Sequence, residues 1–338
     1  MRKRNRILDF LALAGSLNAI RIVNLFKLCI GYFVFLLFKI VSGKGLPMAA
    51  SIEPTTSCNL RCPECPSGSG TLQRSKGSME IKFFSSLVDQ ISPHLIYLTL
   101  YFQGEPYLNP AIYSMIAYAR ARKIYVATST NGHYLDDAAA EATVRSGLNR
   151  LIVSLDGTDQ ETYSAYRKGG DYYKVTEGIR RVAEWKNKLG VSHPYLIIQF
   201  LVLSSNEHQK DTIKKLGCEL GADEVKLKKA QFNEYKSGNL LMPLDKKHSR
   251  YKATVDRGFV PSTGLANRCF RMWSSTVITW DGIVVPCCFD KNADHHMGNL
   301  ADVDFKTIWK SSEQNRFRSQ VRNSRSSVEI CCNCTQRW

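Results

Sequence analysis

Three cysteines, Cys58, Cys62 and Cys65, have the spacing C-x3-C-x2-C, and the next cysteine along the chain is Cys218. A closed structural zinc site takes four ligands, and an iron–sulfur cubane normally takes four cysteines. Three thiolates in one short loop therefore leave a coordination position open, where chemistry can take place. A zinc knuckle with a distant fourth ligand and chance clustering are the alternatives. The zinc alternative is weakened because zinc favours C-x2-C pairs.

A second group of cysteines lies between residues 269 and 334. Four thiolates are a complete set for a closed iron–sulfur cluster or, alternatively, for a structural zinc ion. The predicted ligands are Cys269, Cys287, Cys331 and Cys334. Cys288 and Cys332 each adjoin one of these residues, so a ligand set shifted by one position is an alternative at either place.

The elements that must position the first cysteine loop alternate between strand-like and helix-like segments, a pattern typical of parallel βα units. The first predicted strand ends at Glu53. The other five cover 95–102, 124–130, 151–155, 195–203 and 224–227. The predicted helices cover 81–91, 111–122, 136–146, 158–167, 173–189 and 207–220. We therefore expect an α/β fold, a partial (β/α)6 TIM-type barrel over residues 48–230. The functional residues of such a barrel lie at the C-terminal ends of its strands.

Polar motifs follow several of these strands. The second strand ends in Gln103-Gly104-Glu105-Pro106, the third in Thr130-Asn131-Gly132, and the fourth in Ser154-Leu155-Asp156-Gly157. Each motif taken alone is an ordinary turn former. Gln199 alternates with apolar residues on the fifth strand, so we expect its amide to point into the barrel, where a buried amide needs partners.

The order of these motifs resembles that of the radical S-adenosylmethionine (SAM) enzymes. In that family three cysteines, here Cys58, Cys62 and Cys65, hold a [4Fe–4S] cluster, and SAM chelates the fourth iron. The resemblance implies reductive cleavage of SAM to methionine and a 5′-deoxyadenosyl radical, which abstracts hydrogen from a substrate C–H bond. It also implies a reducing partner such as flavodoxin or ferredoxin.

The resemblance further assigns the contacts to SAM. The family motif Gly-Gly-Glu-Pro corresponds to residues 103–106, with glutamine in place of the first glycine. The implied SAM-binding residues are Gln103, Gly104, Glu105, Thr130, Asn131, Ser154, Arg167 and Gln199. Arg167 resembles a family arginine that pairs with the SAM carboxylate, and a surface arginine is the alternative. No catalytic residue is assigned.

The C-terminal region carries a strong hairpin signal, two β-rich runs joined at Asp281-Gly282, and a predicted helix over 305–321. Together with the four cysteines, this region resembles the twitch domain, a truncated SPASM domain that binds an auxiliary [4Fe–4S] cluster. A full SPASM domain uses seven cysteines to bind two auxiliary clusters, whereas the predicted ligand set here has four cysteines and binds one. Together with the SAM-binding cluster, we expect two [4Fe–4S] clusters in the protein. Residues 269–338 form this predicted domain, and 231–268 form a linker that also covers the active site.

The N-terminal residues 1–47 form a separate extension with eight basic residues and one acidic residue. Its apolar run, Leu28–Phe38, is shorter than the ~20 residues that span a bilayer. One interpretation is a helix that lies on an anionic membrane surface, with contact through residues 20–42. The other is a helix packed against the open side of the barrel.

Composition limits the remaining possibilities. A chain of 338 residues suits one large domain and a small one, and its formal charge of +16 admits nucleic acid, an anionic membrane or an acidic substrate as partner. No basic helix or aromatic platform is evident, so we expect no nucleic-acid partner. Eleven cysteines without a secretory signal indicate a reducing, cytoplasmic setting with or without peripheral membrane contact. We interpret Cys29 and Cys218 as buried thiols.

Three functions follow from these patterns. The first is oxidation of a small sugar-like or aminocyclitol-like substrate, with the auxiliary cluster as electron acceptor, since the C-terminal module is similar to that of 2-deoxy-scyllo-inosamine dehydrogenase. The second is maturation of a peptide, as in the sulfatase and peptide maturases, although a 47-residue extension is too short for their peptide-recognition domain. The third is a non-catalytic iron–sulfur protein that transfers electrons or acts as a sensor.

Overall fold

The computed structural model describes residues 2–41 and 44–335. It divides into two compact units. Unit 1 contains residues 1–10, 58–71 and 127–262, and unit 2 contains 11–57, 72–126 and 263–338. The predicted extension 1–47 and domain 269–338 include residues outside the described range, and the predicted domain boundaries stay predictions.

Unit 1 contains the second half of the barrel strands. Residues 127–130 of β3 (Tyr125–Thr130), β4 (Arg150–Ser154), β5 (Tyr195–Val202) and β6 (Glu224–Lys229) are parallel and pair in that order. The helices are α3 (Pro66–Ser69), α6 (Asp137–Arg145), α7 (Gln160–Tyr166), α8 (Tyr172–Lys188) and α9 (Lys210–Glu219), with the 3-10 turn η2 (Glu207–Gln209) before α9. Most side chains of β5 are buried, as expected for a parallel strand covered on both faces.

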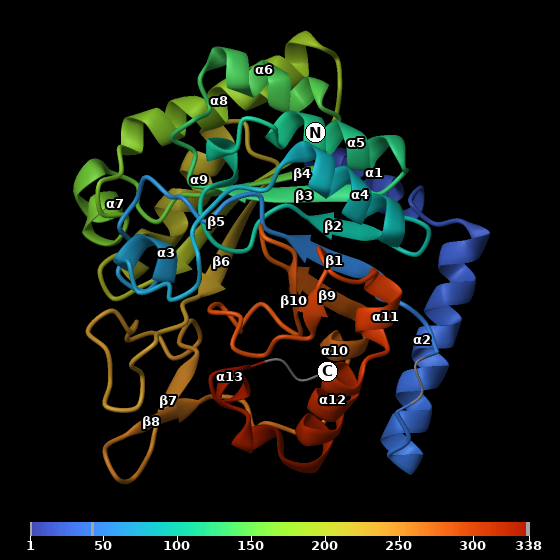
Figure 1. Ribbon diagram of the computed structural model, residues 1–338. Coiled ribbons are helices and arrows are strands. Elements are labelled where there is room, and N and C mark those ends of the chain that lie inside the picture. Colours follow the sequence, from blue (N-terminus) through green and yellow to red (C-terminus); the bar gives the residue numbers. More distant parts are fainter. Residues whose placement is uncertain (1, 42–43, 336–338) are drawn as a thin grey trace. The chain divides into compact units, whose positions relative to one another are not determined.

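Unit 2 contains the first barrel strands and the C-terminal hairpin in one sheet. Its strands are β1 (Ala49–Ile52), β2 (Tyr97–Thr99), β9 (Ser275–Ile278), β10 (Ile283–Val285) and β11 (Gly298–Asn299). β9 pairs in parallel with β1, on the side opposite to β2, and β10 returns antiparallel to β9 (Figure 1). The predicted hairpin therefore extends the sheet of the barrel, which the sequence pattern did not indicate.

The helices of unit 2 surround this sheet. They are α2 (Ala19–Phe38), α4 (Ile81–Ile91), α5 (Ile112–Ala121), α10 (Arg271–Ser274), α11 (Phe305–Trp309), α12 (Ser312–Ser324) and α13 (Glu329–Cys332), with the 3-10 turns η1 (Pro106–Leu108) and η3 (Arg325–Ser327). A further helix, α1 (Arg2–Ala14), begins the chain. The alternation of strands and helices from β1 to β6 confirms the predicted α/β fold of the partial-barrel type.

Two predicted segments differ from the structure. The helix predicted over 305–321 is two helices. The first ends at Trp309, and Ser311 caps the second by accepting a hydrogen bond from the backbone N–H of Gln314. The predicted linker contains a short hairpin of β7 (Tyr251–Ala253) and β8 (Phe259–Pro261). Three-residue strands are too short to give a periodic signal.

The helix that contains the N-terminal apolar run is longer than the run itself, so the prediction of a segment too short to span a bilayer was wrong. α2 starts at Ala19, where Asn18 caps it by accepting from the N–H of Arg21 at 2.9 Å. It has 20 residues and is long and apolar enough to cross a membrane, by length and composition alone. One face of α2 packs against the protein and the other is exposed.

Two cysteines were predicted wrongly as buried. Cys29 and Cys218 are both exposed. Cys29 follows the buried Leu28 on α2, and Cys218 follows the buried Gly217 on α9. Adjacent positions on a helix point in different directions, so a small apolar residue beside a buried one can face solvent.

Candidate active site and cluster sites

The first cysteine loop is held by hydrogen bonds within unit 1. Cys62 is buried, while Cys58 and Cys65 are half-buried. The backbone N–H of Arg61 donates to the carbonyl of Lys168 at 2.9 Å. Nδ2 of Asn131 donates to Oδ1 of Asn59 at 2.7 Å and to Sγ of Cys58 at 3.9 Å. The predicted SAM residue Asn131 is therefore placed against the first cysteine.

Arg167 lies on the second cysteine of the loop. Its Nε donates to Oδ2 of Asp156 at 2.6 Å, and its Nη1 lies 3.9 Å from Sγ of Cys62. Burial alone would lower the pKa of Arg167, but the negative charges of Asp156 and Cys62 raise it well above its ordinary value. The surface-arginine alternative is wrong, because the guanidinium forms a buried ion pair. Its predicted contact with SAM stays a prediction.

Three polar residues share a row across the strands of unit 1. Ser154 on β4 pairs in register with Gln199 on β5, and Gln199 pairs with Lys226 on β6. Residues in register on neighbouring strands present their side chains to the same face of a sheet. Thr130 accepts a hydrogen bond from the N–H of Gly132 at 3.0 Å, which supports the turn after β3. The sequence analysis missed Lys226, whose register with Gln199 appears only once the strands are aligned.

The segment after β6 packs against the cysteine loop. Phe232, Tyr235 and Tyr251 are buried in one cluster with Leu60 and Cys62. The carboxylate of Glu64, which lies between the second and third cysteines, accepts from the backbone N–H of Asn233 at 2.7 Å and from Nδ2 of Asn239 at 2.9 Å. These contacts shield one side of the loop from water.

In unit 2, the predicted SAM motif follows β2. Gly104 has φ of +73°, and a Cβ there would lie 2.3 Å from the carbonyl oxygen of Thr55, so glycine is required. The backbone N–H of Glu105 donates to the carbonyl of Ser57 at 2.7 Å. Ser57 directly precedes Cys58 in the chain. The amide of Gln103 donates to the carbonyl of Phe102 at 3.1 Å.

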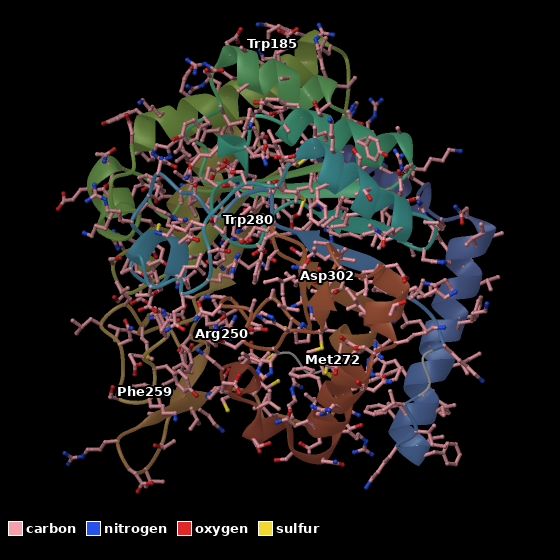
Figure 2. All side chains as sticks on the ribbon, in the orientation of Figure 1. Trp185, Arg250, Phe259, Met272, Trp280 and Asp302 are labelled. Carbon is pink, nitrogen blue, oxygen red and sulfur yellow. The ribbon has the colours of Figure 1, made fainter. Side chains whose placement is uncertain are left out.

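A buried ion pair that the sequence analysis missed organises this region. Glu53, directly after β1, is fully buried and binds the guanidinium of Arg74 through both carboxylate oxygens. Its oxygens also accept from the backbone N–H groups of Gln103 and Trp280, each at 3.2 Å. Burial raises the pKa of Glu53, and Arg74 opposes that shift. Trp280 lies in the turn between β9 and β10 (Figure 2).

The four predicted auxiliary ligands line one small cavity in unit 2. These are Cys269, Cys287, Cys331 and Cys334. Nη2 of Arg325 donates to Sγ of Cys334 at 3.2 Å. The adjoining cysteines make other contacts, since Cys288 accepts from Nη1 of Arg271 at 3.5 Å and Cys332 donates to the carbonyl of Ser326 at 3.2 Å.

The numbers of cysteines in the two donor sets match those of iron–sulfur clusters. In a [4Fe–4S] cubane each thiolate binds a different iron. A loop with three cysteines and a cavity with four match the thiolate sets that one SAM-binding cluster and one closed cluster require.

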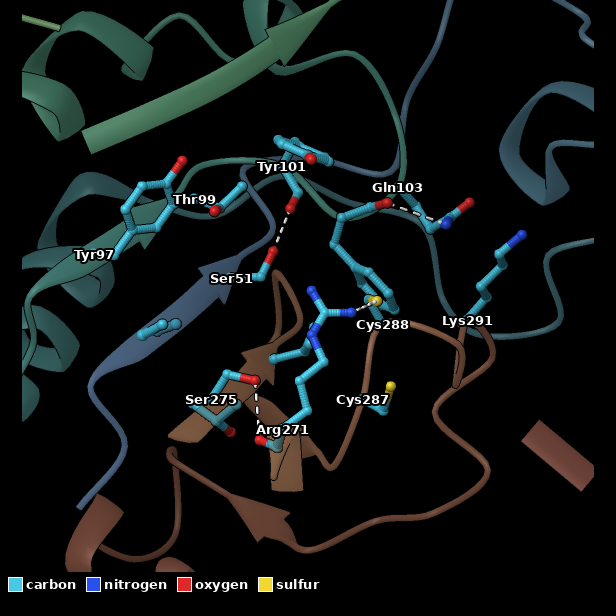
Figure 3. Close-up of a pocket in the computed structure, with 15 residues that line it drawn as sticks. Ser51, Tyr97, Thr99, Tyr101, Gln103, Arg271, Ser275, Cys287, Cys288 and Lys291 are labelled. Atoms are coloured by element: carbon cyan, nitrogen blue, oxygen red, sulfur yellow. Dashed lines mark hydrogen bonds between the residues drawn. The ribbon is translucent and has the colours of Figure 1, made fainter. Parts of the chain in front are cut away.

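A larger cavity of about 340 Å³ lies beside the auxiliary site in unit 2. One wall comes from β1, β2 and the residues after β2, and the other comes from β9 and the segment that carries Cys287 and Cys288. Figure 3 shows Arg271 reaching toward Cys288 between Ser51 and Cys287, with Gln103 and Lys291 nearby. The lining includes six hydroxyl groups and two cationic side chains, but no carboxylate among the described residues that form it. The hydroxyl groups belong to Ser51, Tyr97, Thr99, Tyr101, Ser275 and Thr276.

Two family models match the chain. The model of the radical SAM superfamily matches residues 52–199, and the model of the SPASM iron–sulfur cluster-binding domain matches residues 269–335. The chain therefore contains a radical SAM domain and a SPASM domain. These domains imply a [4Fe–4S] cluster, SAM and auxiliary iron–sulfur binding. The radical SAM domain marks the chain as an enzyme, which sets aside the non-catalytic alternative.

Three similar proteins illustrate the range of this family. Mycofactocin maturase MftC of Mycobacterium ulcerans is 27% identical over 141 residues, which are 42% of this chain but only 38% of the maturase. PqqA peptide cyclase of Gluconobacter oxydans is 26% identical over 290 residues, 80% of this chain and 79% of the cyclase. The crystal structure of BtrN in complex with AdoMet and 2-DOIA aligns over 86% of this chain and 94% of BtrN, at 18% identity and a TM-score of 0.54, which shows a shared fold.

Proposed function

We propose that the protein cleaves SAM reductively and oxidises a small hydroxylated substrate, with an auxiliary cluster in the SPASM domain as electron acceptor. The observation that carries this proposal is the 340 Å³ cavity, which is lined both by barrel strands and by the segment that carries Cys287. A substrate bound there would contact both a radical SAM domain and an auxiliary site. Its hydroxyl-rich lining suits a sugar or aminocyclitol, which binds by many hydrogen bonds.

The cluster ligands in this proposal are the cysteines of the two donor sets. Cys58, Cys62 and Cys65 would hold the SAM-binding cluster, and Cys269, Cys287, Cys331 and Cys334 would hold the auxiliary one. When bound, the two clusters supply an electron for SAM cleavage to a 5′-deoxyadenosyl radical and an acceptor for the second electron of the substrate. A reductase such as flavodoxin or ferredoxin would provide the first electron.

The residues of the chain have separate tasks in this reaction. We assign SAM binding to Gln103, Gly104, Glu105, Thr130, Asn131, Ser154, Arg167 and Gln199. Phe232 and its aromatic neighbours exclude water from the cysteine loop. Arg271 and Lys291 place positive charge in the substrate cavity, where they orient hydroxyl or anionic groups of the substrate.

Peptide maturation is the second candidate function. Its support is the similarity to a mycofactocin maturase and to a PqqA peptide cyclase, the latter over most of both chains. A peptide side chain that carries a hydroxyl would also fit the lining of the cavity. The two candidates share the chemistry of SAM and differ in the size of the substrate.

Deuterium transfer tests the two candidates directly. The reduced protein is incubated with SAM and either aminocyclitols and sugars deuterated at carbon or deuterated peptides, and the label in 5′-deoxyadenosine is measured. Transfer from a small polyol, with a product that has lost two electrons, is the expected result. Transfer from peptides alone would establish the second candidate and overturn the first.

The electron-acceptor role has its own test. The variant Cys287→Ala removes one thiolate from the auxiliary cavity. It is expected to keep hydrogen transfer to 5′-deoxyadenosine while losing the oxidised product at least tenfold. Equal yields of oxidised product from the variant and the wild type would contradict an auxiliary cluster as acceptor.

A further inference from the structure

The inner face of α2 is fixed to unit 2 near its start. Arg21 is buried, and its guanidinium donates to four backbone carbonyl oxygens. These belong to Ser16, Ser92, Arg122 and Lys123, at 2.6 to 3.0 Å. Pulling this end of the helix away from the protein would leave a charged group without its hydrogen bonds, which is costly.

The middle of α2 is held by the chain that returns toward β1. Asn24 exchanges two hydrogen bonds of 2.8 Å with the backbone of Leu46. Gly45 lies so close that a Cβ would stand 2.7 Å from the backbone nitrogen of Leu28. The carbonyl of Gly45 also accepts from Nε1 of Trp309 at 3.0 Å.

The end of α2 packs on the SPASM domain. Phe35 is buried against Trp273, with ring centroids 5.1 Å apart, and Tyr32 packs edge-on against Phe270 at 5.0 Å. Nη2 of Arg322 donates to the carbonyl of Leu36 at 3.1 Å. The helix is therefore attached along its whole length and is not a detached membrane span.

The outer face of α2 is a continuous apolar stripe. Its residues recur at intervals of three or four, the spacing of one helix face. They are Ile20, Val23, Phe26, Ile30, Phe33 and Leu37, each between 50% and 65% exposed. A helix of 20 residues is ~30 Å long, so the stripe is one long exposed apolar patch, unlike the single exposed apolar residues that are common on protein surfaces.

The charged residues of the segment that carries the stripe are all positive. From Phe10 to Ile52 the sequence has no Asp or Glu, and Lys27, Lys39 and Lys44 are exposed. Two copies of this chain joined through the stripe would bring like charges together, which is unfavourable. An anionic surface would instead complement them.

We propose that the outer face of α2 docks on an anionic lipid bilayer, with the helix lying in the interface and not crossing it. The apolar stripe enters the boundary between headgroups and acyl chains, while the flanking lysines contact anionic headgroups. The buried inner face of the helix keeps the enzyme fixed against the bilayer. This inference is independent of the proposed substrate.

Vesicle flotation of the full-length, cluster-loaded protein tests the proposal. Vesicles of phosphatidylcholine are compared with vesicles that also contain phosphatidylglycerol. The wild type is expected to float with the anionic vesicles and to be released by high salt. The double variant Phe26→Gln/Phe33→Gln should bind at least about tenfold more weakly, because it removes two large side chains from the apolar stripe.

A matched control removes apolar surface elsewhere. Leu240 and Leu244 are 97% and 87% exposed in unit 1, so Leu240→Gln/Leu244→Gln should bind like the wild type. Unchanged SAM cleavage by the Phe26/Phe33 variant shows that it is folded. Absence of wild-type flotation, equal binding by the Phe26/Phe33 variant, or a dimer that this variant disperses would each overturn the proposal. Resistance to alkaline carbonate extraction would overturn the interfacial orientation.

Discussion

Arg167 and Asp156 form an ion pair inside unit 1, with Nε of Arg167 2.6 Å from Oδ2 of Asp156. The other oxygen of Asp156 accepts from the backbone N–H of Leu201 at 2.6 Å, so the pair joins the segment after β4 to strand β5. Nη1 of the same guanidinium reaches Cys62. A single buried contact thus connects the barrel strands to the cysteine loop.

Asp156→Asn should destabilise the protein by about 3–5 kcal/mol, because it leaves the buried charge of Arg167 unpaired. Chemical denaturation of the protein without clusters measures this loss. Asp156→Asn/Arg167→Gln serves as the control, since it removes both charges and should recover part of the stability. If the double variant is as unstable as the sum of the single variants, the ion pair is not coupled as described.

Gly104→Ala should abolish SAM binding while leaving the auxiliary cluster in place. The new Cβ would collide with the carbonyl of Thr55 and displace the segment that carries Glu105. Equilibrium dialysis with SAM is the measurement, with an expected loss of at least about tenfold. Gly190→Ala is a matched control, because Gly190 also has a positive φ but has no atom within 4 Å of the added Cβ. Equal SAM binding by the two variants would refute the assignment.

Cys287→Ala and Cys288→Ala should differ in iron content. Only Cys287 lines the cavity that it shares with Cys269, Cys331 and Cys334, while Cys288 contacts Arg271. Cys287→Ala should therefore lose about four irons per chain and Cys288→Ala none. The opposite pattern would show that the ligand set is shifted by one position.

His133 should make stability depend on pH. Its ring accepts from the backbone N–H of Asp171 at 2.8 Å and contacts Oδ1 of Asn131 at 3.0 Å, an arrangement that requires a neutral ring. Burial lowers the pKa of His133. Because the folded pKa lies below the unfolded value of about 6.5, its stabilisation is complete above that pH and is lost as the pH falls through the folded pKa.

Melting temperatures of the wild type and His133→Gln between about pH 8 and about pH 5 test this dependence. The wild type should lose more stability over that range than the variant, which has no titrating ring. If the melting temperatures of the two proteins fall equally as the pH is lowered, protonation of His133 does not cause the loss of stability at acid pH.

The helices and strands were predicted well where apolar residues recur with the regular spacing of a helix or a strand. The helix over 81–91 and the strands over 124–130 and 195–203 agree with the structure to within a residue or two, because each has a clear apolar pattern. The length of α2 was missed because the polar Arg21 and Asn24 interrupt the apolar run. Both residues are buried and hydrogen-bonded to backbone groups that are distant in sequence.

The site was predictable only in its local motifs. Cysteine spacing and strand-end residues can be read from the chain, but the pairing of β9 with β1 is a long-range contact that no local pattern reveals. Glu53 and Lys226 were missed for the same reason. The role of Glu53 depends on Arg74 and Trp280, and the place of Lys226 depends on its register with Gln199.

Cleavage of SAM by the reduced, cluster-loaded protein tests the central claim most directly. Iron, sulfide and 5′-deoxyadenosine are measured anaerobically on the wild type and on the Cys58→Ala/Cys62→Ala/Cys65→Ala variant. About eight irons in the wild type and about four in the variant, with 5′-deoxyadenosine formed by the wild type alone, are the predicted results. A fully loaded and reduced wild type that forms no 5′-deoxyadenosine would contradict the account.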